Sequence, residues 1–164
     1  MGCCISTPYV YPDGGVYDGE LKNGLPHGKG KIQWKNGDYF EGVFEAGKKN
    51  GRGIFKWSDS SYYDGEFKNE NFHGYGEYQW YGGRLYKGQW VEGKMEGQGV
   101  LIDDGKHYQG QFKNDKKEGL GEMKWSNGQQ YIGEWKNGKQ DGKGKLIDAN
   151  GHVTEGLWSK GKKQ

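Results

Sequence analysis

Apolar and aromatic residues alternate with polar ones along most of the chain, and the alternation returns every 23 residues, with one interval of 22. Each copy opens with an aromatic residue, has a glycine two positions later and Leu, Phe or Trp two positions after that, and contains Gly-x-Gly further on. Alternate residues of a β-strand share a face, so the pattern predicts two strands per copy, stacked side by side as tandem hairpins. Full copies one to six begin at Tyr17, Phe40, Tyr63, Tyr86, Tyr108 and Tyr131, and a partial seventh begins at Thr154.

A glycine follows each opening residue at the same distance. Glycine inside a strand is entropically unfavourable, so its strict recurrence needs a physical reason. Aromatic rings from neighbouring strands can lie across the bare glycine backbone, which lets a single sheet bury apolar area without a second layer. We expect Gly28, Gly30, Ile32 and Trp34 to share this ring-bearing face. The recurring glycines are Gly19, Gly42, Gly65, Gly88, Gly110, Gly133 and Gly156.

The copies are separated by dipeptides that favour tight turns, because both residues can adopt positive φ. About 13 strands spaced ~4.8 Å apart give a ribbon on the order of 60 Å long, which a twist of roughly 20° per strand coils. The predicted fold is all-β: an elongated, twisted, single-layer antiparallel sheet of tandem β-hairpins. The dipeptides are Asn36-Gly37, Gly82-Gly83, Asp104-Gly105, Asn127-Gly128 and Asn150-Gly151.

Residues 17–164 closely resemble the MORN repeat (membrane occupation and recognition nexus), whose pattern is Tyr-x-Gly-x-Trp-x-x-Gly-x-x-x-Gly-x-Gly. Glu70 and Asp115 replace its mid-loop glycine, which leaves the loop shape of copies three and five open, and Thr154 replaces an opening aromatic residue. The resemblance implies roles in membrane junctions and in ciliary and cytoskeletal assemblies. It also implies phospholipid binding and homodimers formed edge to edge or end to end.

Composition narrows the function classes. Only 31% of the residues are hydrophobic and 33 are glycine, so a thick core is not expected, while 7 Trp, 12 Tyr and 6 Phe in register argue against disorder. The net charge of +2 comes from 24 basic and 22 acidic residues that are interleaved. No nucleic-acid partner is therefore predicted. The sequence shows no membrane-spanning run and no secretory signal, which predicts a cytosolic chain.

Residues 1–16 form a segment before the repeat domain, which spans residues 17–164. Gly2, with Ser6 at the hydroxyl position, fits the N-myristoylation pattern, and the adjacent Cys3 and Cys4 resemble palmitoylation sites. One myristoyl chain binds membranes only marginally, and no polybasic patch precedes Lys22, so thioester-linked chains supply the second signal. The alternative is an unmodified tail. Residues 7–15 read as a spacer, in which Tyr9–Tyr11 could instead add an edge strand.

No catalytic site, metal site or cofactor is predicted. His27 and His73 lie two copies apart, about 19 Å across four strands, which is too far for one metal ion. The run Gly24-x-x-x-Gly28-Lys29-Gly30 lacks the spacing and the Ser or Thr of a phosphate loop. Carboxylates such as Asp64 lie in repeat register without a recognisable acid–base partner.

The sequence thus predicts a non-catalytic adaptor, anchored through Gly2, Cys3 and Cys4 to the cytoplasmic face of the plasma or ciliary membrane, that presents its repeats to an unknown protein partner. One alternative is a soluble cytoskeletal or ciliary structural protein without acyl chains. A second is a module that binds anionic phosphoinositide headgroups through cationic residues expected in exposed loops: Lys48, Lys49, Arg52, Lys116, Lys117 and Lys143.

Overall fold

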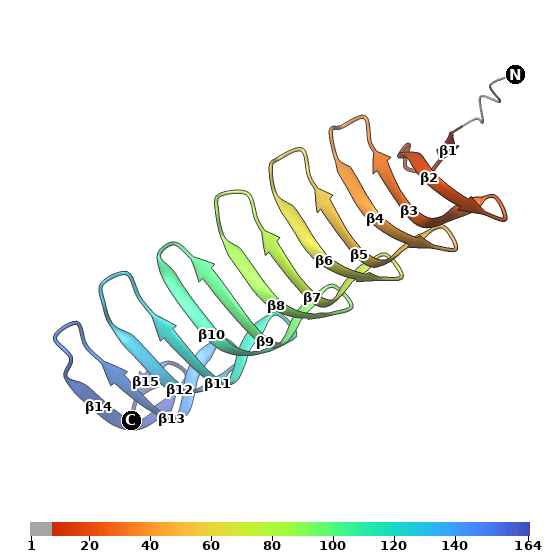
Figure 1. Ribbon diagram of the computed structural model, residues 1–164. Coiled ribbons are helices and arrows are strands. Elements are labelled where there is room, and N and C mark those ends of the chain that lie inside the picture. The colour runs from red at the N-terminus through yellow and green to blue at the C-terminus, as the bar shows by residue number, and fades with distance from the viewer. Residues whose placement is uncertain (1–7) are drawn as a thin grey trace, which may run out of the picture.

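The computed structural model describes residues 8–164 and consists of one sheet of fifteen antiparallel strands. Neighbours in the sheet are also neighbours in the chain, so the ribbon advances hairpin by hairpin from β1 to β15 (Figure 1). The predicted all-β ribbon of tandem hairpins is confirmed. The strands are β1 (Tyr9–Val10), β2 (Val16–Lys22), β3 (Leu25–Gln33), β4 (Tyr39–Glu45), β5 (Lys48–Lys56), β6 (Tyr62–Lys68), β7 (Asn71–Gln79), β8 (Leu85–Val91), β9 (Lys94–Asp103), β10 (Lys106–Lys113), β11 (Lys116–Lys124), β12 (Gln130–Lys136), β13 (Lys139–Ile147), β14 (Val153–Ser159) and β15 (Lys162–Lys163).

One row of glycines crosses the sheet from β2 to β14, because each strand aligns a glycine with a glycine of the next strand. Gly65 pairs with Gly53 on one side and with Gly76 on the other. Every strand from β2 to β14 is therefore in the same register relative to this glycine row. The glycine row consists of Gly19, Gly30, Gly42, Gly53, Gly65, Gly76, Gly88, Gly99, Gly110, Gly121, Gly133, Gly144 and Gly156.

The strands bend at this row. The ring centroids of Phe40 and Phe44 lie 5.2 Å apart, whereas four residues of extended strand span about 13 Å. The two rings flank Gly42 and lean towards each other, so the ring-bearing side of the sheet is concave. We call this side the inner face and the opposite side the outer face. The curvature of the strands is visible in Figure 1.

The rings cover the glycine row on the inner face, as the sequence predicts. A Cβ atom added to Gly65 would lie 2.5 Å from the hydroxyl oxygen of Tyr63, closer than van der Waals contact allows. Tyr63 itself is fully buried. The row therefore admits only glycine wherever an opening tyrosine or phenylalanine lies across it.

The first glycine of each Gly-x-Gly does not lie under the rings, and this part of the prediction is wrong. Gly74 has φ +59°, and a side chain there would meet the carboxylate of Glu66. The ladder is interrupted at this point, since Gly65 pairs with Gly76 but Glu66 pairs with His73. The glycine thus forms a β-bulge, which needs a left-handed residue. The other first glycines are Gly28, Gly51, Gly97, Gly119 and Gly142, all with positive φ.

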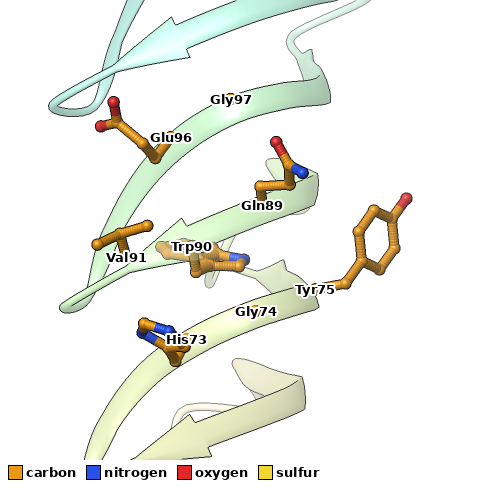
Figure 2. A pocket seen from close by; sticks show the side chains of 8 residues that line it. All are labelled: His73, Gly74, Tyr75, Gln89, Trp90, Val91, Glu96 and Gly97. Atoms are coloured by element: carbon orange, nitrogen blue, oxygen red, sulfur yellow. The ribbon is translucent and has the colours of Figure 1, made fainter.

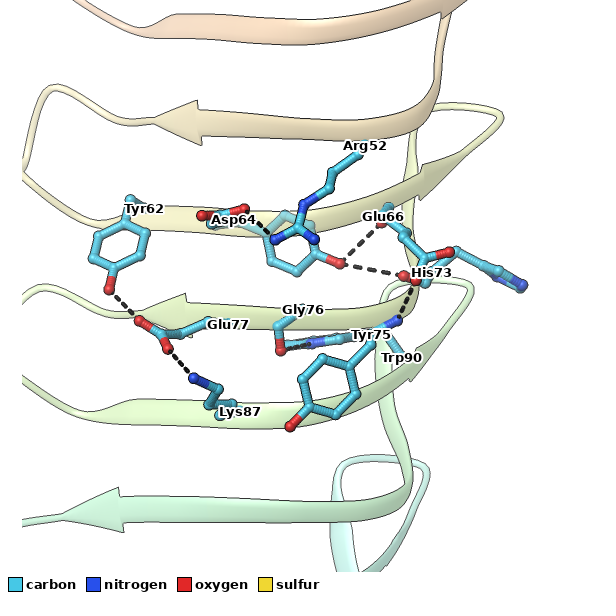
Figure 3. Close-up of polar contacts among 11 residues, drawn as sticks. Arg52, Tyr62, Asp64, Glu66, His73, Tyr75, Gly76, Glu77, Lys87 and Trp90 are labelled. Atoms are coloured by element: carbon cyan, nitrogen blue, oxygen red, sulfur yellow. Dashed lines mark hydrogen bonds and ion pairs between the residues drawn. The ribbon is translucent and has the colours of Figure 1, made fainter.

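A side chain on the neighbouring strand closes each bulge in five of the copies. The carboxylate of Glu66 accepts a hydrogen bond from the backbone N–H of Tyr75 at 3.1 Å (Figure 3). The bond satisfies a backbone donor that the bulge removes from the ladder. The equivalent acceptors are Glu20, Gln89, Gln111 and Glu134, and copy two has Val43 at this position.

The loops within the copies are two-residue turns, and copies three and five keep the same shape without the family glycine. Asn69 and Glu70 have φ of 48° and 74°, and Asn114 and Asp115 have 47° and 65°. The replacements gain a bond in return: the Asp115 carboxylate accepts the N–H of Met95 at 2.8 Å, while the Asp115 N–H donates to the Met95 carbonyl.

The connections between copies are short, but the predicted double positive φ holds only for Gly82-Gly83 and Asp104-Gly105. In the other three dipeptides only the glycine has positive φ. These connections are longer turns closed by two backbone hydrogen bonds, as at Trp34, and Gly82-Gly83 lies in a turn of the same kind that begins at Trp80. The two-residue turn at Asp104-Gly105 is shorter, since β9 ends at Asp103 and β10 begins at Lys106. This accounts for the single interval of 22 residues.

The sheet begins upstream of the first full copy. β1 pairs with β2 through Tyr9 and Tyr17, which confirms the edge strand considered for this segment. The turn that follows β1 repeats the hydrogen-bond pattern of the later turns, with Tyr11 in the place of Trp34. The hydroxyl of Tyr11 donates to the carbonyl of Gly47 at 2.9 Å, and burial raises its pKa. Residues 9–15 thus form the second half of a repeat that caps the ribbon.

Candidate functional site: the two faces of the ribbon

The inner face holds the core. Each opening ring contacts, edge to face, the ring that closes the first strand of the next copy. Tyr108, for example, lies 5.1 Å from Trp135, and Trp135 donates its indole N–H to the carbonyl of Gly121 at 3.1 Å. Burial raises the pKa of Tyr108. These contacts link every copy to the next through buried rings. The other pairs are Tyr17–Phe44, Phe40–Phe67, Tyr63–Trp90, Tyr86–Phe112 and Tyr131–Trp158.

A second row of rings on the inner face is only half-buried. Five rings contact in series with centroid distances of 5.3, 4.4, 5.2 and 4.4 Å. Half-exposed rings in a row offer flat apolar area on which proline or aromatic side chains of an extended peptide can pack. The sequence analysis placed the tryptophans on this face but missed that they form a continuous surface. We call it the aromatic stripe: Trp34, Phe55, Trp57, Tyr78 and Trp80.

Two of the predicted loop cations also lie on the inner face. The ammonium of Lys49 lies 5.5–5.7 Å from the ring centroids of Trp34, Phe40 and Phe55 and forms an ion pair with Glu70. The ammonium of Lys117 lies over the ring of Tyr108. Such contacts with aromatic faces are attractive for a cation, so these two lysines are part of the packing.

The other predicted cations point elsewhere. Arg52, in β5, is on the outer face, where its guanidinium lies 3.5 Å from Asp64 (Figure 3). Lys143 is exposed on the same face eight strands further along the ribbon, in β13. Lys48 and Lys116 are exposed at the starts of β5 and β11. The structure thus brings the six cations to two faces and does not gather them into one cluster.

The outer face is charged, and its charges pair across strands. Glu77 accepts a hydrogen bond from the hydroxyl of Tyr62 and lies 3.3 Å from the ammonium of Lys87 (Figure 3). The bond to the carboxylate raises the pKa of Tyr62 to about 12. Exposed pairs of this kind contribute little stability each, but opposite charges facing each other favour the observed register. Lys31 and Asp18 form a similar pair at 3.1 Å.

Shallow hollows lie between the bulges. One of about 390 Å³ is lined by His73, Tyr75, Gln89, Trp90 and Glu96, among others, and the Tyr75 ring projects away from the strand (Figure 2). Tyr75 is 55% exposed. The lining mixes aromatic, amide and charged groups without a nucleophile–base pair in contact. Such a hollow can accept a side chain of a partner.

Two further observations concern metals and membranes. Within the described residues, 8–164, no three His, Cys, Asp or Glu side chains come together as a metal site would require. His152 instead lies 3.0 Å from Asp148 in its own turn. That same part of the chain has no helix whose length and apolar character would let it cross a bilayer. Gly2, Cys3 and Cys4 lie outside the described residues.

The repeat register is matched by the family model of the MORN repeat. The chain belongs to the MORN-repeat family. Repeats of this family are in general non-catalytic modules with interaction or structural roles. The six MORN repeats matched are residues 17–39, 40–62, 63–83, 86–105, 108–130 and 131–153.

Solved structures with a similar fold include the TCP domain of SAS-4 (dCPAP) from Drosophila melanogaster, in complex with a Proline Rich Motif of Ana2 (dSTIL). The TM-score is 0.53 at 12% sequence identity, over 91% of this chain and 81% of that one. A second structure, the TCP10c domain of Drosophila melanogaster Sas-4, gives a TM-score of 0.48 at 11% identity, over 92% and 90% of the two chains. At this identity the first similarity concerns the fold alone.

Proposed function

We propose that this MORN protein is a non-catalytic scaffold, held at the cytoplasmic face of a membrane by acyl chains on Gly2, Cys3 and Cys4, that presents its inner face to a protein partner. The observation that carries the binding role is the aromatic stripe, which a rigid ribbon holds half-exposed. The similar fold of the SAS-4 TCP domain, which is in complex with a proline-rich motif, supports a partner of this kind.

The anchoring role rests on the sequence and on chain geometry. Gly2, Cys3 and Cys4 provide one amide-linked and two thioester-linked acyl sites, which together exceed the marginal affinity of a single myristoyl chain. Five residue steps separate Cys4 from Tyr9, and extended chain spans at most about 18 Å over that length. Acylation would therefore hold the β1 end of the ribbon next to the membrane.

Fractionation of cells that express the full chain tests the anchor. We expect Gly2→Ala to release the protein into the soluble fraction, and Cys3→Ser with Cys4→Ser to weaken membrane association even when the myristoyl group is present. Thr7→Ala is the matched control for a change in the same segment, because Thr7 lies outside the N-myristoylation pattern that ends at Ser6. Membrane association that survives Gly2→Ala would contradict the acyl anchor, and wild-type protein found in the soluble fraction would favour the soluble structural protein with an unmodified terminus.

A photo-crosslinking amino acid tests the binding face. It replaces Trp57 on the aromatic stripe in one variant and Tyr75 on the outer face in the other. We expect a partner adduct from position 57, whose ring lies between Phe55 and Tyr78, and none from position 75. Adducts from position 75 alone would move the binding role to the outer face.

The phosphoinositide alternative has a separate test. Unacylated full chain is mixed with vesicles that contain or lack phosphatidylinositol bisphosphate. Because the six cations divide between two faces, we expect no binding that depends on the anionic lipid at physiological salt. Binding that Arg52→Gln and Lys143→Gln both weaken would favour that alternative.

A further inference from the structure

The aromatic stripe stops in copy four. Copies one, two, three and five have a tryptophan directly after their second strand, whereas copy four has Asp103 at this position. The Asp103 carboxylate, 54% exposed, takes the place of a half-buried ring. Charged groups surround this carboxylate, and they outnumber it. The equivalent tryptophans are Trp34, Trp57, Trp80 and Trp125.

Arg84 covers the last ring of the stripe. Its guanidinium carbon lies 4.6 Å from the centroid of Trp80. Its Nε lies 3.8 Å from the Asp103 carboxylate, an ion-pair distance that is too long for a hydrogen bond. This Nε is buried and has no hydrogen-bond partner among residues 8–164. A buried donor without an acceptor is unfavourable, which points to a missing acceptor at this place.

Lys117, in β11, is a further cation on the inner face. Its ammonium lies 5.2 Å from the ring of Tyr108 and 4.9 Å from that of Trp135. The equivalent residue of copy two, Lys49, has Glu70 of the following loop as its partner. The corresponding loop residue after Lys117 is Gly138, and Lys117 forms no ion pair with any described residue.

The charges that act on Lys117 come from three other strands or turns. Burial first, and then the like charges of Lys106 and Arg84, lower the pKa of its ammonium to about 8, against the opposing effect of Asp103. Tyr108, whose pKa is raised by burial, stays neutral beside it. Three cations and one carboxylate leave a net charge of about +2 when all are ionised.

We propose that Arg84, Lys106 and Lys117 form an oxyanion-binding site at the end of the aromatic stripe, which takes the carboxylate or phosphate of an acidic side chain in an extended peptide. An oxyanion there supplies the acceptor that the Arg84 Nε lacks and the counter-charge that Lys117 lacks. Asp103, in place of a tryptophan, leaves a smaller side chain between Arg84 and Lys106, with which Asp103 pairs in the sheet.

The peptide source of the anion rests on the proposed scaffold function. The cations lie in line with the half-exposed rings, and Arg84 is stacked on one of them. A peptide can use the rings and the cations together, through a proline or aromatic residue followed by an acidic one. A lipid headgroup would use only the cations.

Titration with sulfate tests the site without reference to any partner. Sulfate keeps a constant charge between pH 7 and pH 9, and chloride holds the ionic strength. We expect saturable shifts of the backbone amide signals of Arg84, Lys106 and Lys117 in nuclear magnetic resonance spectra of the unacylated full chain. Because the bound anion raises the pKa of Lys117 towards its ordinary value, affinity should be roughly tenfold weaker at pH 9 than at pH 7.

The repeats supply conservative variants for this titration. Gln140 and Gln129 occupy the positions of Lys117 and Arg84 in later copies, so Lys117→Gln and Arg84→Gln suit the fold. Each should weaken sulfate binding about tenfold or more, and Lys117→Gln should abolish its pH dependence. Asp103→Asn should strengthen binding, while Arg52→Gln on the outer face should leave it unchanged. Shifts absent from these amides, or unchanged in Lys117→Gln, would overturn the site.

A proline-rich peptide library with one randomised position tests whether the bound oxyanion comes from a peptide. We expect wild-type protein to enrich Asp, Glu or phosphoserine at that position and Lys117→Gln to lose the enrichment. Retention of neutral peptides without acidic enrichment would overturn this assignment and leave the scaffold function intact. Saturable sulfate binding without retention of any peptide would leave the anion site and contradict the peptide-binding role. Vesicles with phosphatidylinositol bisphosphate form the third arm, and binding there that needs Lys117, without peptide enrichment, would assign the site to lipid.

Discussion

The hydroxyl of Tyr63 donates a hydrogen bond to the backbone carbonyl oxygen of Glu66, 2.9 Å away, on the other side of the bend at Gly65. The same bond joins Tyr17 to Glu20, Tyr86 to Gln89, Tyr108 to Gln111 and Tyr131 to Glu134. A strand normally points its carbonyl groups at its neighbours. Here the bulge interrupts the pairing with the neighbouring strand, and the tyrosine hydroxyl of the same strand supplies a donor for the carbonyl oxygen. In these five copies the opening tyrosine therefore fills the concave side and holds the bend, whereas in copy two the ring of Phe40 fills it without this bond.

Tyr63→Phe should lower the free energy of unfolding by about 1 kcal/mol, since it removes the hydrogen bond but leaves the ring. Phe40 occupies the equivalent position in copy two, so the fold accepts a phenylalanine there. Urea denaturation of both proteins measures the difference. A loss above about 3 kcal/mol would mean that the ring itself is repositioned.

Gly76→Ala should be strongly destabilising, by about 3 kcal/mol or more, because the new methyl group would overlap the Tyr63 ring. Gly156→Ala is the matched control in the same row. Its methyl group would meet only the end of the flexible Lys163 side chain, because Thr154 replaces the opening tyrosine there. We expect a change within about 1 kcal/mol for the control in thermal or urea unfolding. Equal losses in the two variants would refute the ring-cover explanation.

Trp135→Ala should cost about 3–5 kcal/mol, since the indole is only 5% exposed and donates to the Gly121 carbonyl. Trp125→Ala, at a half-buried position, should cost less. Thermal unfolding followed by circular dichroism compares them. A midpoint of Trp135→Ala close to that of the parent protein would contradict the packing described for copies five and six.

Glu70→Gly restores the family residue and should nevertheless destabilise the protein, by about 1 kcal/mol. The loop keeps its shape with glycine, but the N–H and the ammonium of Lys49 both lose their acceptor. Gly138→Ala in the equivalent loop controls for the effect of the left-handed position alone. A more stable Glu70→Gly variant would show that backbone strain at Glu70 outweighs its bonds.

Ionisation of the tyrosines should lower stability above about pH 10. The pKa of Tyr62 and of Tyr39 is raised to about 12, in each case first by a hydrogen bond to a carboxylate. The unfolded chain releases these protons near pH 10, so ionisation favours unfolding between pH 10 and pH 12. Denaturant midpoints measured over this range, with Tyr62→Phe for comparison, test the sign. Stability that rises with pH above 10 would contradict it.

The sequence predicts the sheet because the glycines and rings recur in strict period, and no other arrangement buries rings such as Tyr63 and Tyr86 with so little apolar material. It does not separate the two glycines of Gly74-x-Gly76, since a bulge and a ring-covered position both demand glycine. The turn at Asn36-Gly37 also differs from prediction, because a dipeptide that tolerates two positive φ angles does not require them.

The inner-face cations were harder to predict. Lys117 follows a turn in the sequence and resembles an ordinary loop lysine. Comparison with the same position in other copies, where Phe72 and Met95 occur, would have indicated a packed site. The proposed anion site depends on Asp103 and Arg84, which come from different copies and meet because Leu85 pairs with Ile102 next to them in the β8–β9 ladder. The acyl sites at Gly2, Cys3 and Cys4 stay a prediction.

Each strand of this sheet bonds only to the strands next to it in the chain. Folding therefore requires no long loop to close, and a hairpin can form as soon as its residues leave the ribosome. The uniform register means that removal of one whole copy would bring two compatible edges together. Ribbon length is thus a variable that duplication or deletion of a single copy can change, while the faces of the remaining copies are kept.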